Sequence, residues 1–178
     1  MNETGKKKIL IVSNRLPVNI RYGENGPAIT ASSGGLVTGL LALQGEFAME
    51  WIGWPGAVTK GDRPAIERML TQEYGSHPVF MAEHVSDRYY EGFSNRSIWP
   101  IFHSLPTYAK FSLLEWEAYK KASELFAEKV LEIYKPGDTI WIHDYHLLLL
   151  SQRLRERLPR ATIGFFLHIP FPHYDIFR

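Results

Sequence analysis

The sequence predicts a doubly wound α/β domain, a Rossmann-like parallel sheet covered by helices. Short apolar, β-branched runs alternate with helical patterns from residue 8 to residue 168, which is typical of a parallel sheet with helices on both faces. The 178 residues suffice for one compact domain with one core. We therefore expect residues 1–178 to form a single domain, with residues 1–8 as a flexible polar lead-in.

Five segments are expected to form the strands. Each is a short run rich in β-branched or aromatic residues, and a polar residue, Gly or Pro follows or ends it. Because helical segments separate them, the strands are expected to pair in parallel. They are 8–14 (KILIVSN), 49–56 (MEWIGWPG), 77–83 (HPVFMAE), 139–143 (TIWIH) and 161–168 (ATIGFFLH).

The segments between the strands carry helix signals. In 62–75, Asp62 precedes the first turn, Pro64 lies within it and Gly75 follows the last turn. Further helices are expected at 36–47, 146–159 and from 174 onward, with two short helices joined at 93–95 within 86–105, and a loop or hairpin over 15–35. The clearest helix is 108–138, with an apolar stripe on Leu114, Tyr119, Ala122, Phe126, Val130 and Ile133.

Composition narrows the function classes. Lys plus Arg total 20 and Asp plus Glu total 19, and this balance argues against a nucleic-acid surface or a polybasic membrane patch. The chain has no cysteine, which excludes disulfides, thiolate chemistry and Cys-ligated metals. No apolar run approaches the ~20 residues that span a bilayer, and no signal-peptide pattern is present. We therefore expect a soluble, cytoplasmic protein that binds neither nucleic acid nor membranes.

Three predicted strands end in polar segments punctuated by proline or histidine: ILIVSNRLP, TIWIHDYH and GFFLHIPFP. Ligands of open parallel sheets bind beyond the carboxyl ends of the strands. Arg15, Asp144 and His168 are therefore expected to face one crevice. A guanidinium at position 15 suits a phosphate or carboxylate, although an ordinary exposed arginine is the alternative. His168 precedes two prolines that stiffen the strand exit.

The HDYH segment at 143–146 allows two interpretations. Its histidines and Asp144 could bind a metal, but a strand followed by a loop offers no fixed helical face and no fourth ligand motif accompanies them. We expect no metal here. Asp144 is better suited to accept hydrogen bonds from sugar hydroxyls, and His143 is expected to be a satisfied core histidine.

Glycines and aromatic residues supply weaker signals. Gly34 and Gly35 precede a predicted helix, where backbone N–H groups favour a phosphate, although a plain turn is equally compatible. Tyr90 and Trp99 could offer a hydroxyl and a flat ring to a sugar, and helix packing is the alternative for the tyrosine. Trp54 in WIGWPG could line a sugar or base site, and packing within a loop is the alternative.

Six stretches, in this order, resemble the N-terminal half of the trehalose-6-phosphate synthases, retaining glycosyltransferases of family 20 with the GT-B architecture. They are VSNRLPV, SSGGLVTGL, WIGWPG, YYEGFSNRSIWPIFH, GDTIWIHDYHLLLL and IGFFLHIPFPHYDIFR. The resemblance implies transfer of glucose from UDP-glucose to glucose 6-phosphate, giving trehalose 6-phosphate and UDP. It implies no cofactor and no metal, and it is compatible with a homo-oligomer of the full-length parent.

The resemblance also implies the roles of single residues at the acceptor site. Arg15 matches the arginine that binds the acceptor phosphate. Tyr90 and Trp99 match the tyrosine and tryptophan of the acceptor pocket. Asp144 matches the aspartate that hydrogen-bonds the acceptor sugar, and it is one of the two residues expected to act in catalysis.

At the donor site, Gly34 and Gly35 match the glycine pair whose loop closes over the diphosphate. His168 matches the histidine that contacts the transferred glucose, and it is the second expected catalytic residue. The donor-binding C-terminal domain is absent from this chain, so the chain alone is expected to be inactive. The alternatives are a catalytically silent homologue that senses sugar phosphates and a related transferase with another acceptor.

Overall fold

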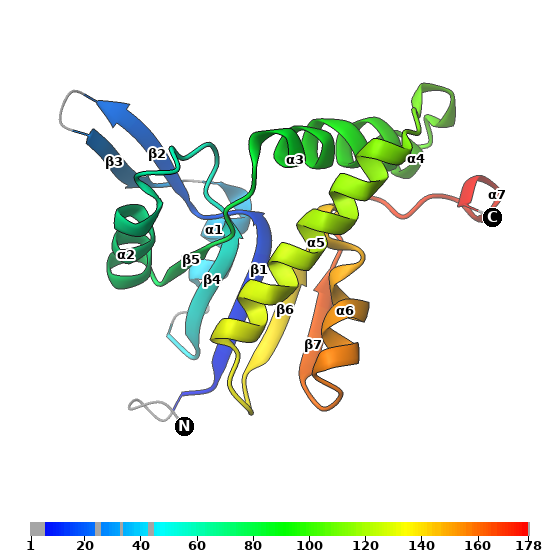
Figure 1. Cartoon of the computed structure of the whole chain (residues 1–178). Coiled ribbons are helices and arrows are strands. Elements are labelled where there is room, and N and C mark those ends of the chain that lie inside the picture. Colours follow the sequence, from blue (N-terminus) through cyan, green and yellow to red (C-terminus); the bar gives the residue numbers. More distant parts are fainter. Residues whose placement is uncertain (1–5, 24–25, 33, 43–44, 178) are drawn as a thin grey trace.

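The computed structural model describes residues 6–23, 26–32, 34–42 and 45–177. Its centre is a five-stranded sheet in the order β5-β4-β1-β6-β7, in which all neighbours pair in parallel (Figure 1). The predicted doubly wound α/β fold is confirmed. The strands are β1 (Lys8–Arg15), β4 (Ala48–Trp54), β5 (Ser76–Pro78), β6 (Thr139–His143) and β7 (Thr162–Phe166).

Helices cover the sheet on both faces, and the core lies in two layers. Successive residues of β1 alternate between them, because side chains of a strand point to opposite faces. Ile9 and Ile11 pack with residues of the first helix pair, whereas Leu10 and Val12 pack with residues of the second pair. The two pairs are α1 (Gly35–Leu41) with α2 (Arg63–Tyr74), and α5 (Leu113–Ile133) with α6 (Leu150–Arg157).

A separate antiparallel hairpin follows β1. It consists of β2 (Val18–Gly23) and β3 (Gly26–Ala31). Of the two structures predicted for residues 15–35, a loop and a hairpin, the hairpin is the one observed. The Tyr22 hydroxyl accepts hydrogen bonds from the Thr59 backbone N–H at 3.2 Å and from its hydroxyl at 3.1 Å. The hairpin is thereby attached to the segment that follows β4.

The segment between β5 and α5 differs from the prediction. Instead of two short helices joined at 93–95, α3 (Glu83–Asp87), a π-helical stretch (Arg88–Ile98) and α4 (Trp99–Phe102) follow one another without a break. Phe93 packs on Trp116 and on Tyr119 of α5, each at 5.0 Å between ring centroids. This packing holds a polar stretch in helical form against its weak local propensity.

Several predicted boundaries are also corrected. Pro78 ends β5 early, because a proline has no N–H for the strand ladder, so 79–83 is not strand. The helix expected at 36–47 ends at Leu41, with residues 43–44 outside the described residues. A 3₁₀ turn (Tyr145–Leu147) precedes α6, and a short helix, α7 (Tyr174–Phe177), ends the described chain as expected.

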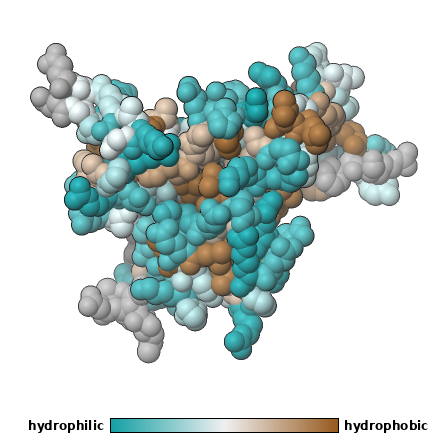
Figure 2. Space-filling view, viewed as in Figure 1, coloured by the Kyte–Doolittle hydropathy of each residue, from teal (hydrophilic) through white to brown (hydrophobic). Residues whose placement is uncertain are grey.

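The first turn of α5 extends beyond the core. Tyr119, Ala122, Phe126 and Val130 of the predicted stripe are buried, but Leu114 is 62% exposed, so its place in the stripe was wrong. Phe111 and Leu113 beside it are exposed as well. Figure 2 shows apolar surface where the start of α5 meets α4.

The opposite end of the sheet carries a buried ion cluster. Lys8, predicted as both the last residue of the lead-in and the first of the strand, is the first residue of β1 and is buried, with its Nζ 2.9 Å from a Glu50 carboxylate oxygen. His77 Nε2 lies 2.8 Å from the other oxygen. These contacts, chiefly the one with His77, lower the pKa of Glu50 to about 2.

Within the described residues, none of the helices combines the length and apolar character needed to cross a bilayer.

Candidate active site

A cavity of about 330 Å³ opens at the carboxyl ends of β1, β6 and β7. These strands are neighbours in the sheet, so the residues that follow them meet at one edge. The predicted gathering of Arg15, Asp144 and His168 around one crevice is therefore confirmed. The predicted site residues that line this cavity are Arg15, Gly34, Tyr90, Asp144 and His168.

An irregularity at the end of β1 positions Arg15. The pairing with β4 shifts between Val12 and Arg15, and the Ser13 hydroxyl donates a 2.8 Å hydrogen bond to the Arg15 carbonyl oxygen. The guanidinium carbon lies 4.8 Å from the ring centroid of Trp54. Arg15 has neither an ion pair nor a side-chain hydrogen bond with any described residue, so its five N–H donors can bind an anion.

Trp54 is a site residue that the sequence left undecided. It ends β4, the neighbour of β1, and its ring lies beneath the Arg15 guanidinium and 6.3 Å from the ring of Tyr90. The strand-end rule that selected Arg15 also applies to Trp54, since both lie at the same edge of the sheet. Trp54 does not line the cavity that holds Asp144, but together with Arg15 it lines a neighbouring cavity of about 790 Å³.

Asp144 begins the loop after β6 in a strained conformation. Its φ of 77° is rare for a residue other than glycine. Its Oδ1 accepts hydrogen bonds from the backbone N–H of Tyr145 at 2.9 Å and of His168 at 3.3 Å, and its own N–H donates to the Phe166 carbonyl at 2.7 Å. No described residue donates to Oδ2, which is therefore available to a ligand hydroxyl.

Two histidines of HDYH are buried and neutral. Burial lowers the pKa values of His143 and His146 to about 4 each. The His146 ring stacks on Tyr90 at 5.5 Å between centroids, and neither of its nitrogens has a hydrogen-bond partner. His143 is buried as expected, but it is not satisfied, because only its Nδ1 has a hydrogen-bond partner.

Within the part of the chain that the structure describes, no three His, Asp or Glu residues are grouped to bind a metal.

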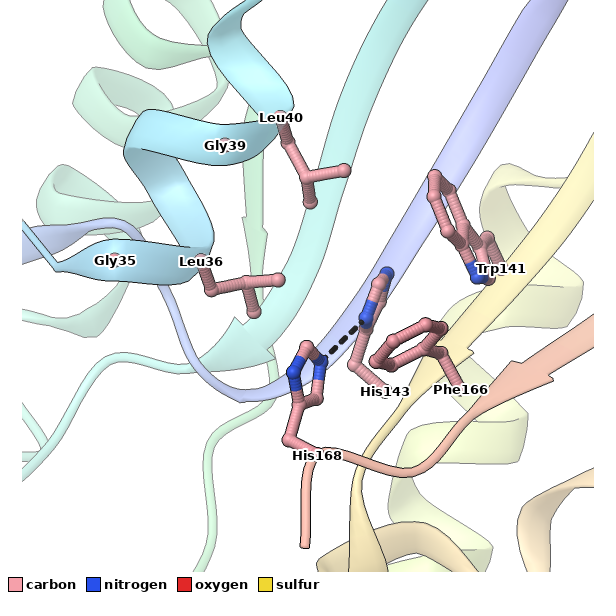
Figure 3. A pocket seen from close by; sticks show the side chains of 8 residues that line it. All are labelled: Gly35, Leu36, Gly39, Leu40, Trp141, His143, Phe166 and His168. Atoms are coloured by element: carbon pink, nitrogen blue, oxygen red, sulfur yellow. Dashed lines mark hydrogen bonds between the residues drawn. The ribbon is translucent and has the colours of Figure 1, made fainter.

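A second cavity, of about 270 Å³, lies between α1 and the ends of β6 and β7 (Figure 3). Gly35 and Gly39 line it from the α1 side, and a Cβ added at either glycine would meet open space. His143 and His168 line both cavities, so the two are adjacent. The predicted glycine pair is thus divided, with Gly34 at the first cavity and Gly35 at the second.

Comparison with known proteins identifies the family. A family model described as Glycosyltransferase family 20 matches residues 7–178. The chain belongs to glycosyltransferase family 20. It is 46% identical over 180 residues to an "alpha,alpha-trehalose-phosphate synthase [UDP-forming] A" of Dictyostelium discoideum, covering 99% of this chain and 24% of the relative. It is 46% identical over 177 residues to an "alpha,alpha-trehalose-phosphate synthase [UDP-forming] 1" of Aspergillus fumigatus, covering 96% of this chain and 34% of the relative.

Solved structures agree with this family 20 assignment. A structure described as "Trehalose-6-phosphate from E. coli bound with UDP-2-fluoro glucose" superposes with a TM-score of 0.75 at 32% identity, over 96% of this chain and 35% of that one. A synthase from Burkholderia xenovorans in complex with glucose-6-phosphate gives a TM-score of 0.73 at 29% identity, over 95% and 35%. The N-terminal domain of a Candida albicans trehalose-6-phosphate phosphatase gives a TM-score of 0.77 at 36% identity, over 97% of this chain and 36% of that chain. The chain thus spans about a quarter to a third of its relatives.

One predicted site residue of this family 20 chain lies apart from both cavities. Trp99 is 40% exposed and stacks on His103 with 3.9 Å between ring centroids. It does not line the cavity that holds Arg15 and Asp144. Its acceptor role stays a prediction. Tyr89, the residue before Tyr90, is buried and donates to Asn14 Oδ1 at 3.0 Å, which is a structural contact.

Tyr119 of α5 supports the segment that follows β6, residues 145–148. Its buried hydroxyl donates to the Tyr145 carbonyl oxygen at 2.7 Å and accepts from the Leu148 N–H at 3.1 Å. We expect Tyr119→Phe to lower the free energy of unfolding by about 1–3 kcal/mol, because two backbone groups lose their partner. Urea unfolding measures this change.

Tyr134→Phe is the matched control, because the Tyr134 side chain is also partly buried and its hydroxyl bonds to no described residue. It should change the free energy of unfolding by less than ~0.5 kcal/mol. Equal effects of the two substitutions would show that the Tyr119 hydroxyl does not support the loop.

Proposed function

We propose that this chain is the acceptor-binding domain of an α,α-trehalose-phosphate synthase. In the full-length protein, glucose would pass from UDP-glucose to glucose 6-phosphate with retention of configuration, giving trehalose 6-phosphate and UDP. The observation that carries the proposal is the cavity in which an unpaired Arg15 faces Asp144 and His168. It occurs in a family 20 chain that is 46% identical to UDP-forming synthases.

The acceptor fits the polar groups of this cavity. The unpaired Arg15 guanidinium supplies charged donors for the 6-phosphate. Asp144 Oδ2 has no donor among the described residues and would accept hydrogen bonds from sugar hydroxyls. Tyr90 adds an aromatic ring to the lining of this cavity, and Trp54 lies against both Tyr90 and Arg15.

The donor would lie across the second cavity, with its diphosphate near Gly34 and Gly35 and its glucose near His168. The bond between the glucose anomeric carbon and the diphosphate oxygen breaks while the acceptor hydroxyl attacks from the same face. The departing phosphate oxygen takes the hydroxyl proton. Catalysis then depends on positioning and on stabilising the charge of the leaving diphosphate, and this domain would supply the positioning.

Substitution of Arg15 tests this proposal. In the full-length protein, Arg15→Ala should raise the KM for glucose 6-phosphate roughly 10- to 150-fold, because a charge-assisted phosphate contact is worth about 1.5–3 kcal/mol. The kcat should change little, since the contact is made in both ground and transition states. Initial-rate kinetics with varied glucose 6-phosphate measure both constants.

Arg21→Ala is the matched control, because Arg21 is an exposed arginine of the β2–β3 hairpin that lines neither cavity. It should leave the KM unchanged. An Arg15→Ala enzyme with the wild-type KM would contradict the assignment of the acceptor phosphate to Arg15.

A second candidate function is a catalytically silent domain that binds sugar phosphates. The match to the N-terminal domain of a trehalose-6-phosphate phosphatase, with a TM-score of 0.77, favours it. Both candidates predict binding of glucose 6-phosphate, and only the synthase predicts UDP release in the full-length protein. The absence of a cofactor, a homo-oligomeric parent and a cytoplasmic location stay predictions.

A further inference from the structure

The two histidines at the ends of β6 and β7 are in direct contact. His143 Nδ1 lies 3.0 Å from His168 Nε2, and the ring centroids are 5.3 Å apart (Figure 3). His143 is almost completely buried, with its ring held between Trp141 and Phe166 at centroid distances of 4.8 and 6.3 Å. His168 is exposed and lines both cavities. The buried His143 is thus hydrogen-bonded to His168, which lines both cavities.

A contact between two neutral imidazole nitrogens holds one proton, so one nitrogen donates and the other accepts. Burial keeps His143 neutral at pH 7, which leaves it a single N–H group. Its other nitrogen, Nε2, is buried without a hydrogen-bond partner among the described residues. A buried N–H group without an acceptor is rarer in proteins than an unused acceptor. The His143 proton therefore belongs on Nδ1, where His168 accepts it.

This assignment fixes the protonation of His168. Its Nε2 accepts the hydrogen bond, so neutral His168 must carry its own proton on Nδ1, the ring nitrogen on the side away from His143. We propose that His143 is a positioning residue that holds His168 as the Nδ1–H tautomer, so that a neutral N–H donor is offered to the ligand. The acceptor of this bond would be an oxygen of the transferred hexose, and this last point rests on the proposed function.

The tautomer can be measured directly on the uniformly ¹⁵N-labelled chain at pH 7.5 and without any substrate. Two-bond ¹H–¹⁵N correlation spectra distinguish protonated from unprotonated ring nitrogens, and His168→Gln assigns the signals. We expect a protonated Nδ1 and an unprotonated Nε2 in His168. A His168 that carries its proton on Nε2 would overturn the proposal, whatever the variants do.

Two substitutions separate positioning from packing. His143→Leu removes the donor, so His168 should shift towards the Nε2–H form that predominates for histidine in water. His143→Asn retains an N–H donor near the Nδ1 position and should keep the Nδ1–H form. Backbone amide spectra verify that each variant is folded. If folded His143→Leu keeps the Nδ1–H tautomer, His143 does not control it and the proposal fails.

The full-length protein supplies the functional readout. His143→Leu should lower kcat roughly tenfold, the lower end of the loss seen when an outer partner of a metal-bound histidine is removed, with the KM for glucose 6-phosphate nearly unchanged. His143→Asn should restore most of this loss. A full-length protein that transfers no glucose, yet shows the expected tautomer, would refute the proposed function and leave the positioning role intact. If the full-length protein transfers glucose but His168 carries its proton on Nε2, the positioning role would be refuted and the proposed function would stand.

Discussion

Gly53→Ala is expected to destabilise the domain by about 3 kcal/mol and to weaken the proposed acceptor site. Gly53 lies in the buried part of β4, beside the irregular end of β1. A Cβ there would lie 2.9 Å from the Leu16 nitrogen, 2.9 Å from the Ser13 oxygen and 3.0 Å from the Arg15 carbonyl carbon. All three atoms belong to the backbone, so strand β1 itself would have to move, and overpacking of this kind costs about 1–3 kcal/mol or more.

The same movement would displace Arg15. A misplacement of about 1 Å in a binding group can cost on the order of 10²-fold in rate. In the full-length protein, Gly53→Ala should therefore raise the KM for glucose 6-phosphate as well as lower the midpoint of urea unfolding. Measuring both quantities on one protein preparation distinguishes a displaced site from general loss of stability.

Gly164→Ala is the matched control, because Gly164 is also a strand glycine, in β7. A Cβ there would lie 3.6 Å from Trp141 Cδ1, which is an ordinary contact distance. This substitution should change the free energy of unfolding by less than ~1 kcal/mol. Similar losses at both positions would mean that the close approach of β4 to the end of β1 is not what requires a glycine.

The sheet and the edge that carries the cavity of Arg15, Asp144 and His168 could be predicted because both depend on local patterns. Apolar runs such as 139–143 have few alternatives to a buried strand, and the period of a strand fixes which side chains enter which core layer. Parallel strands then bring their carboxyl ends to one edge. This rule alone was sufficient to place Arg15, Asp144 and His168 at one cavity.

What the sequence did not predict depends on contacts between distant segments. The stretch 88–98 is helical because Phe93 packs on α5, and no pattern within the stretch itself indicates that partner. Likewise, His143 was assigned to the core because it ends an apolar strand. Its contact with His168, 25 residues further along the chain, arises only when β6 and β7 pair. The strained φ of Asp144 has no sequence signal either.

Acidification should destabilise the domain because His143 and His146 are buried in neutral form. Each has a pKa of about 4 in the folded protein, against the ordinary histidine value of 6.5 in the unfolded chain. Between these values the unfolded chain binds more protons than the folded one, so the free energy of unfolding falls as the pH falls. At pH 4 the loss approaches about 3 kcal/mol for each histidine, a large part of the 5–15 kcal/mol typical of a domain.

Urea unfolding at several pH values from 7.5 to 4 measures this dependence. His146→Phe should reduce the slope between pH 6.5 and 4, because a phenyl ring can stack on Tyr90 without binding a proton. The exposed His84 provides the control, and His84→Ala should leave the slope unchanged.

Glu50 affects stability in a lower pH range than the two histidines, so its titration can be separated from theirs. Its pKa of about 2 lies below the ordinary value of 4.5, so its contribution to stability is present above that value and is lost as the pH falls from 4.5 towards 2. The histidine effect is largely complete before this loss begins. If wild type and His146→Phe show the same slope from pH 6.5 to 4.5, His146 is protonated in the folded protein as readily as in the unfolded chain. Its buried, stacked position, with Nδ1 3.8 Å from Asp144 Oδ2, would then not exclude the charge.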